Sequence, residues 1–166
     1  MPKKQIWKQK PERLSSWQTL KVNHSFKALT TIYLRYFSMK ESLAKDIMIK
    51  DLYTIKSSSK VGLARLKMMR HGVGGLPVVN DKKTLLGMIT LRDIDLAGLD
   101  VSNLTVEDLM TTNLVKGNEN TTLKQIVELM VKTGVQRIPI VDKKEKLIGL
   151  VTQTSVIKHA LAFSLL

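Results

Sequence analysis

The chain of 166 residues contains no cysteine. This absence excludes disulfide bonds, zinc sites with cysteine ligands and catalysis by a thiol. No uncharged stretch approaches the roughly 18 residues that a membrane-spanning helix needs. The basic N-terminus also lacks the apolar segment and the cleavage site of a signal peptide. We therefore expect a cytoplasmic protein with no membrane partner.

Acidic residues are few relative to basic ones. The chain has 14 Asp and Glu against 27 Lys and Arg, which gives a net charge of +13. The excess is uneven, because residues 1–43 hold nine basic and only two acidic residues. This asymmetry predicts a basic N-terminal extension, residues 1–43, and such an extension is typical of proteins with a polyanionic partner.

Motifs of enzyme active sites are also missing. His24, His71 and His159 do not have the spacing of metal ligands. The sequence has neither a nucleophile elbow of the Gly-x-Ser-x-Gly type nor a phosphate-binding loop of the Gly-x-x-x-x-Gly-Lys-Ser/Thr type. We expect no enzymatic activity, no catalytic residue, no metal and no required cofactor.

The chain does contain an internal repeat. Residues 44–95 align without a gap on residues 106–157, which lie 62 positions further on. "GLPVVNDKKTLLGMITLRD", which starts at Gly75, thereby matches "RIPIVDKKEKLIGLVTQTS", which starts at Arg137. A glycine, a proline and a threonine coincide within this stretch. Two copies of this length predict a pair of half-units related by a pseudo-twofold axis.

Both copies predict the same order of secondary structure. A short helical segment ("LAKDIM" or "VEDLM") precedes a β-prone segment ("LYTI" or "NLV") and an amphipathic helix. Two strands joined by a Lys-rich turn follow, and a closing helix begins near Asp93 or Thr154. We expect an α/β (α+β) fold of two β-α-β-β-α units that pack sheet to sheet, since one unit is too small to bury both faces of its sheet.

The amphipathic helices carry signals for their ends and for their buried side. Thr121 or Thr122 is suited to cap the second helix, and Gly72 and Gly134 follow the two helices at their C-terminal ends. The methionines at helical spacing are interpreted as core residues: Met68, Met69 and Met130.

The stretches "DIM…GVGGLPVVNDKKTLLGMITLRDI" and "DLM…GVQRIPIVDKKEKLIGLVTQTSV" resemble a tandem of cystathionine-β-synthase (CBS) domains, the pair called a Bateman module. The resemblance covers about residues 44–160 and implies one unit in residues 44–100 and another in residues 101–166. It also implies a non-catalytic regulatory module that binds AMP, ADP, ATP or another adenosyl compound between the copies and signals to a partner. A homodimer is implied too, with "TSVIKHALAFSLL" as a contact surface.

The motif "GMITLRD" matches the family pattern Gly-apolar-x-Ser/Thr-x-x-Asp. A carboxylate at Asp93 can accept both hydroxyls of a ribose, and a hydroxyl at Thr90 suits a phosphate. Asp93 is equally suited to cap a helix, so both interpretations stay open. The resemblance implies a composite pocket with walls from both copies: Met88, Thr90, Asp93, Leu114, Val115, Val135, Gln136, Arg137 and Ile138.

The second copy departs from the pattern, because Ser155 replaces the carboxylate of Asp93. The opposite pocket also has Gly75 in the place that Arg137 takes in the first pocket. The resemblance therefore implies a second, weaker site, lined by Leu52, Tyr53, Val73, Gly74, Gly75, Leu76, Leu150, Thr152 and Ser155.

The N-terminal extension supports an alternative function, that of a ribosome- or RNA-associated factor with the repeat pair as scaffold. Lysines that neutralise phosphates alternate there with aromatic rings that can stack on bases. A solvated tail with docked aromatic residues, or a true start at Met39, explains the extension equally well. The residues predicted to contact RNA are Lys3, Lys4, Trp7, Lys8, Lys10, Arg13 and Trp17.

Overall fold

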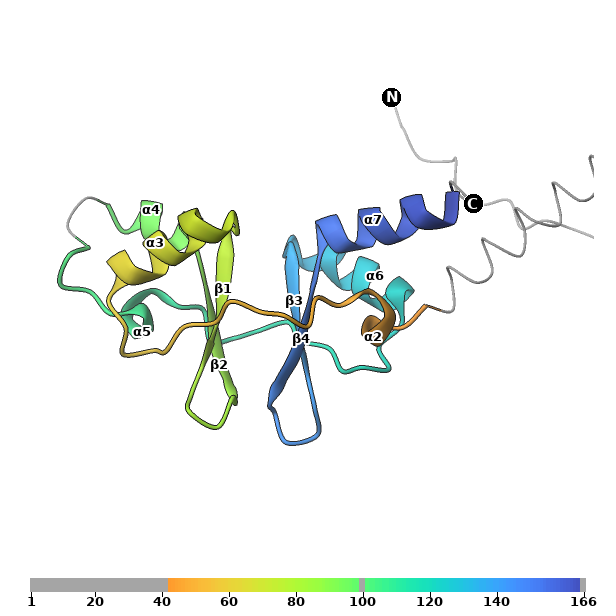
Figure 1. The fold of residues 1–166 in the computed structure, drawn as a ribbon, viewed down its shortest axis with the longest axis horizontal. Coiled ribbons are helices and arrows are strands. Elements are labelled where there is room, and N and C mark those ends of the chain that lie inside the picture. Colours follow the sequence, from red (N-terminus) through yellow and green to blue (C-terminus); the bar gives the residue numbers. More distant parts are fainter. Residues whose placement is uncertain (1–41, 99–100, 165–166) are drawn as a thin grey trace, which may run out of the picture. The chain divides into compact units, whose positions relative to one another are not determined.

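The computed structural model describes residues 42–98 and 101–164, so the residues predicted to contact RNA lie outside the described part. The α/β class is confirmed, with helices around two antiparallel hairpins (Figure 1). The first copy contains α2 (Ala44–Ile47), α3 (Val61–His71), β1 (Gly75–Val79), β2 (Leu85–Thr90) and α4 (Leu91–Leu96). The second contains α5 (Val106–Leu109), α6 (Leu123–Thr133), β3 (Arg137–Val141), β4 (Leu147–Thr152) and α7 (Gln153–Ser164).

The predicted helix ends are confirmed. Thr122 is the N-cap of α6, where its Oγ1 accepts the N–H of Gln125 (3.2 Å) while the Gln125 side chain accepts the N–H of Thr122 (3.0 Å). Gly72 and Gly134 end α3 and α6 with φ angles of 61° and 74°, in the left-handed region that glycine adopts at little cost.

The β-prone segments before α3 and α6 do not form full strands. The first makes one parallel bridge, between Ile55 and Val78. In the second copy the equivalent bridge, between Gly117 and Ile140, lies two residues beyond the predicted segment "NLV". A turn begins at Ser57, two residues after Ile55, so the first segment leaves the sheet after one pairing. Each sheet of the described part therefore has two strands, with a β-bulge in each hairpin.

Each hydrophobic core is completed by the short helix of the other copy. Met68, Leu76 and Ile89 of the first copy form a core with Val106, which belongs to α5 of the second copy. Ala44 and Ile47 of α2 in turn join the core of the second copy: Leu123, Ile126, Met130, Ile138, Ile140 and Val151. Figure 1 shows the same exchange, with α5 beside β1–β2 and α2 beside β3–β4. The boundaries of the two cores are thus offset from those of the sequence repeat.

Several large apolar side chains lie on the outer surfaces of the helices. Met68 and Met130 are buried as predicted, but the prediction for Met69 is wrong, since this side chain is 68% exposed. Met69 lies about 100° around α3 from Met68 and therefore faces solvent. Ile157 and Leu161 of α7 are also exposed, so the apolar surface expected for a contact with a second chain is present, while that contact itself stays a prediction.

Glycines allow the two copies to approach closely. A Cβ atom at Gly87 would lie 2.8 Å from the sulfur of Met110 and 2.9 Å from the carbonyl oxygen of Thr111. Gly149 is packed in the same way against Met48 of the first copy. In both hairpins the neighbour that a side chain would displace comes from the other copy.

Candidate functional site

A cleft of about 340 Å³ lies between the two copies. We call it the Tyr53 cleft. It contains every residue of the predicted weaker site except Leu76, which belongs to the first core, and Ser155. Its lining residues are Ile49, Asp51, Leu52, Tyr53, Gly72, Val73, Gly74, Gly75, Pro77, Gln136, Arg137, Leu150, Thr152, Gln153 and Thr154.

Tyr53 contributes the one aromatic ring among the described residues that line this cleft. The rings of Tyr53 and His71 are stacked, with 3.6 Å between their centroids and 16° between their planes. Tyr53 remains 41% exposed. His71 is the last residue of α3, so the end of this helix holds the ring of Tyr53 in place. Tyr53 therefore adds an aromatic ring to the lining of the cleft, with one of its faces covered by His71.

Arg137 lines the Tyr53 cleft, although the resemblance implied a place for it in the other predicted pocket, that of Asp93. The residue begins β3, opposite Thr152 of β4. A Cβ atom at Gly74 would lie 2.6 Å from its Nη2, so the guanidinium occupies space that a side chain at Gly74 would fill. Burial lowers the pKa of Arg137, although a guanidinium stays protonated in proteins. Because Gly74 has no side chain, the guanidinium of Arg137 can reach the Tyr53 cleft.

The stem of Arg137 still lies close to the first predicted pocket. A Cβ atom at Gly75 would lie 3.5 Å from Cδ of Arg137 and 3.1 Å from Cγ2 of Thr90. The structure therefore brings Thr90 and Arg137 together beside the position that a side chain of Gly75 would take.

The carboxylate of Asp93 caps α4. Its Oδ2 accepts the N–H of Thr90 (2.8 Å) and the hydroxyl of Thr90 (2.7 Å), while Thr90 Oγ1 accepts the N–H of Asp93 (3.3 Å). Thr90 is the N-cap, so Asp93 is the third residue of a helix that begins at Leu91, slightly earlier than predicted. The helix-capping interpretation accounts for all these bonds, and binding of a ribose by Asp93 stays a prediction.

The same arrangement recurs at the start of α5. Asp108 Oδ2 accepts the N–H and the hydroxyl of Thr105, both at 2.7 Å. These hydrogen bonds, the backbone one first, lower the pKa of Asp108. A threonine followed three residues later by an aspartate therefore forms this local structure at more than one place in the chain.

Ser155 keeps the cap of the second copy without a negative charge. Its Oγ accepts the N–H of Thr152 (3.0 Å) and donates to the carbonyl oxygen of Thr152 (2.9 Å). Thr152 Oγ1 accepts the N–H of Ser155 (3.0 Å). Serine thus replaces aspartate in the backbone interaction, and only the carboxylate is lost.

Some of the other residues of the first predicted pocket belong to the hydrophobic cores or pack against them. Ile138 is fully buried in the second core, and Val115 and Val135 pack against it. Met88 is 7% exposed, and its N–H and carbonyl both bond to Thr111 (3.0 and 2.9 Å). Leu114 is half-buried, and Gln136 is exposed and lines the Tyr53 cleft.

Some residues of the Tyr53 cleft were missed from the sequence. Gln153 and Thr154 follow Thr152 directly and are the two middle positions of the motif that reads Thr-x-x-Asp in the first copy and Thr-x-x-Ser in the second, so the motif pointed to them. Pro77 lies on the face of β1 opposite to the core residues Leu76 and Val78, and this alternation also pointed to it. No comparable signal marks Ile49 and Asp51.

Metal ligands and membrane-spanning helices can be assessed for residues 42–98 and 101–164. In these ranges no group of three His, Asp or Glu residues could hold a metal ion. No helix there is long and apolar enough to cross a membrane.

Comparison with known proteins gives both relatives and solved structures. An inosine-5′-monophosphate dehydrogenase of Methanocaldococcus jannaschii is 35% identical over 116 residues, which are 70% of this chain and 23% of that protein. The chain therefore spans less than a quarter of the length of this relative. Curated dehydrogenases of the same name from other organisms are covered to a similar extent.

Two crystal structures of CBS pairs resemble the chain along nearly their whole length. CBSX2 of Arabidopsis thaliana in complex with AMP is 30% identical, with a TM-score of 0.67 over 74% of this chain and 98% of CBSX2. The CBS pair of protein MJ0100, in complex with 5′-methylthioadenosine and S-adenosyl-L-methionine, is 29% identical, with a TM-score of 0.65 over 70% of this chain and 98% of that one. The family model described as "CBS domain" matches residues 44–99 and 106–162. The chain therefore belongs to the CBS domain family, as a tandem pair of these domains.

Proposed function

We propose that this chain is a non-catalytic regulatory module that binds an adenine nucleotide, or a related adenosyl compound, between its two CBS domains. The Tyr53 cleft is the observation that carries this proposal. Its volume of about 340 Å³ lies within the usual range for small-molecule sites. The complexes of CBSX2 with AMP and of the MJ0100 pair with adenosyl compounds support the choice of ligand class.

The cleft offers complementary groups for such a ligand. The ring of Tyr53, held by its stack on His71, suits the flat face of a purine. Arg137 supplies two or more N–H donors for a phosphate, and its partial burial strengthens such charge-assisted bonds. Thr152 begins the segment that leads into α7 and adds a hydroxyl donor on the same side.

Asp51 can replace the carboxylate that the second copy lacks. Ser155 cannot accept both hydroxyls of a ribose as a carboxylate does. Asp51 is exposed and lines the same cleft from the first copy. A ligand in the Tyr53 cleft would thus use a carboxylate and an aromatic ring from one copy and a guanidinium and a hydroxyl from the other.

This division of the contacts provides a mechanism for signalling. A ligand that touches both copies stabilises the relative arrangement in which all of its contacts are made. A partner that prefers this arrangement would bind more tightly when the cleft is occupied. The pocket around Asp93 is proposed as a further site, with Thr90 and Arg137 as neighbours.

Isothermal titration calorimetry with AMP tests the site. We expect Arg137→Ala and Tyr53→Ala each to weaken binding at least tenfold, about 1.4 kcal/mol, because each removes a direct contact. Tyr53→Phe keeps the ring and should bind normally. Arg70→Ala, which removes an exposed arginine that does not line the cleft, is the matched control for loss of positive charge. Affinity that is unchanged in both alanine variants would exclude the Tyr53 cleft.

A further inference from the structure

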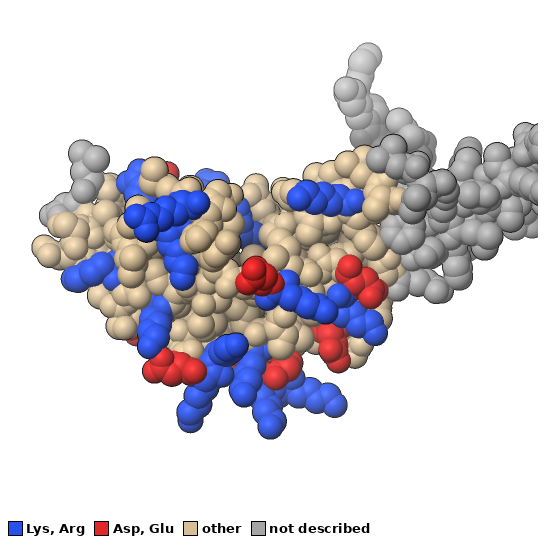
Figure 2. All heavy atoms as spheres, in the orientation of Figure 1, with Lys and Arg blue, Asp and Glu red and all other residues tan. Residues whose placement is uncertain are grey.

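The turns of the two hairpins lie side by side. The N–H of Leu85 donates to the carbonyl of Glu145 (3.1 Å), and the N–H of Leu147 donates to the carbonyl of Lys83 (3.0 Å). An antiparallel bridge between Thr84 and Lys146 connects them further. Figure 2 shows the lysines of this region projecting together at the lower edge of the molecule. We call the exposed lysines of the two turns the basic ridge: Lys82, Lys83, Lys143, Lys144 and Lys146.

The acidic residues of the turns already have partners. Asp81 forms an ion pair with Lys56 (2.5 Å), and Glu145 forms one with Lys116, both outside the basic ridge. Asp142 Oδ1 accepts the N–H groups of Lys144 and Lys146, at 2.8 and 2.9 Å. Within residues 42–98 and 101–164, none of the five ridge lysines forms a salt bridge. All five ammonium groups are therefore open to an anionic partner, while those of Lys144 and Lys146 also interact electrostatically with Asp142 and lower its pKa.

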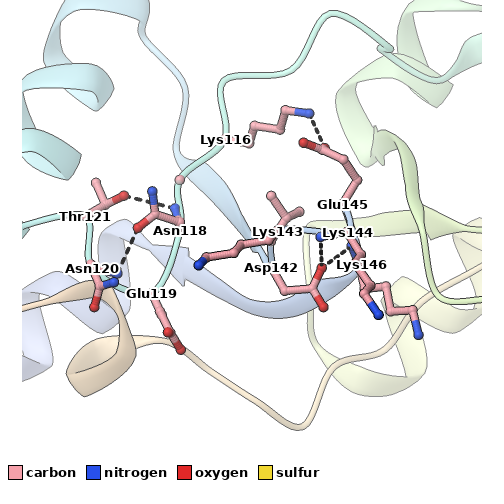
Figure 3. Close-up of a pocket in the computed structure, with 12 residues that line it drawn as sticks. Lys116, Asn118, Glu119, Asn120, Thr121, Asp142, Lys143, Lys144, Glu145 and Lys146 are labelled. Carbon is pink, nitrogen blue, oxygen red and sulfur yellow. Dashed lines mark hydrogen bonds and ion pairs between the residues drawn. The ribbon is translucent and has the colours of Figure 1, made fainter.

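A hollow beside the turn of β3–β4 extends this polar surface. It has a volume of about 840 Å³ and lies between the turn and the segment 116–121 (Figure 3). Its wall is ordered by local bonds, since the N–H of Asn118 donates to Thr121 Oγ1 (2.9 Å) and the N–H of Asn120 donates to Asn118 Oδ1 (2.9 Å). Figure 3 shows Lys143 extending across the hollow toward this segment.

We infer that the basic ridge binds the phosphate backbone of a nucleic-acid duplex without sequence preference. Five ammonium groups on two adjoining turns can each neutralise a phosphate, the main source of affinity in such complexes. Contacts of lysine to phosphates position a protein on a duplex but do not read bases. The ridge and its hollow contain no aromatic side chain, so they lack the stacking surface that single-strand binding uses.

The surroundings of the basic ridge favour a nucleic acid over a membrane or a protein. The large apolar side chains exposed in the described part belong to Ile49, Tyr53 and the helices α3, α4, α6 and α7. Neither turn therefore offers an apolar anchor, which peripheral membrane binding and protein interfaces both use. The ridge also shares no residue with the Tyr53 cleft, so this inference does not depend on adenosyl binding.

Fluorescence anisotropy of the full chain with a labelled RNA duplex of about 16 base pairs, measured over a series of salt concentrations, tests the inference. The variant K82Q/K83Q/K143Q/K144Q removes four ridge charges. We expect at least a tenfold loss of affinity and a salt dependence, log K against log salt, that is less steep by about 3 to 4. The control K45Q/K50Q/K132Q/K158Q removes the same charge from exposed lysines elsewhere and should keep the affinity within about threefold.

Further variants and probes make each outcome decisive. The double variants K82Q/K83Q and K143Q/K144Q should each reduce the slope of log K against log salt by about half as much as the fourfold variant does. They replace the fourfold variant in the test if that variant does not fold. Equal losses in ridge and control variants would overturn the inference, because net charge or the N-terminal extension would then be responsible. A loss that appears only with phosphatidylserine vesicles, or only with single-stranded RNA, would also overturn it. AMP titration of the ridge variant should be normal and separates this result from the proposed function.

Discussion

The two copies share a backbone but differ in the charges that they place along it. Ser155 makes the same bond to the N–H of Thr152 that Asp93 makes to the N–H of Thr90. At another equivalent position Gly75 of the first copy corresponds to Arg137 of the second. The local hydrogen bond needs only an acceptor atom, so the carboxylate could be lost without loss of the helix start.

The hairpin turns show the same relation. Asn80 Oδ1 accepts the N–H groups of Lys82 and Thr84, at 3.0 and 2.9 Å, as Asp142 Oδ1 does for Lys144 and Lys146. The comparison teaches that a cap or a turn needs only an acceptor atom at these positions. The charge of that atom instead affects ligand binding and the pH dependence of stability. Function can therefore differ between copies that fold alike.

The largest effect is expected in the cores. Met68→Ala and Met130→Ala remove equivalent buried side chains, and each should lower the free energy of unfolding by about 2–5 kcal/mol. In the double variant Val106→Ala/Met68→Ala, the loss of unfolding free energy should differ from the sum of the two single losses by about 0.5 kcal/mol or more, because both residues belong to the first core. With Met130→Ala, which belongs to the second core, the losses should simply add. Urea unfolding measures all three. Coupling with Met130 instead would contradict the exchange of short helices.

A smaller effect is expected from exchanging the capping residues. Asp93→Ser copies the arrangement of Ser155 and should leave the melting temperature nearly unchanged. It should nevertheless weaken AMP binding at the Asp93 pocket at least tenfold, about 1.4 kcal/mol, because the carboxylate is removed. Calorimetry measures the affinity, and Asp93→Ala, which removes both cap and charge, should also lower the melting temperature. If Asp93→Ser binds AMP at this pocket as the wild type does, Asp93 is only a cap.

The smallest effect concerns acid stability. Bonds from the backbone of Lys146 and Lys144, with the positive charges of both side chains, lower the pKa of Asp142 despite some desolvation. A lowered folded-state pKa contributes stability above the unfolded value of about 3.9, and this contribution is lost as the pH falls through the folded value. Asp142→Asn, which copies Asn80, should therefore reduce the difference in unfolding free energy between pH 7 and acid pH.

The reverse substitution is the matched control. Asn80→Asp should increase this acid sensitivity, and both variants can be compared by urea unfolding at each pH. Asp108, whose pKa is also lowered, contributes in the same direction in all of these proteins. An acid sensitivity that neither substitution changes would show that the turn carboxylate does not contribute.

The sequence predicted the elements that depend on local chemistry. Thr122, Gly72 and Gly134 end their helices as expected, because a cap needs only neighbouring backbone groups. Local patterns failed where the outcome depended on distant neighbours. Met69 follows the apolar pattern of α3 but has no core on its side, and the segment around Ile55 has strand propensity but meets β1 at one residue only.

By itself the sequence determined the duplication and the α/β class, since these follow from repeat register and side-chain period. The resemblance to the CBS family indicated Leu52, Tyr53, Val73, Gly74 and Gly75, which line the Tyr53 cleft. Only the tertiary structure decided which cleft receives Arg137 and which core receives each short helix. Both outcomes depend on contacts between residues that are far apart in the chain: the free space beside Gly74 admits Arg137, and Val106 packs in the first core. No local pattern contains that information, because it arises only when the two copies meet.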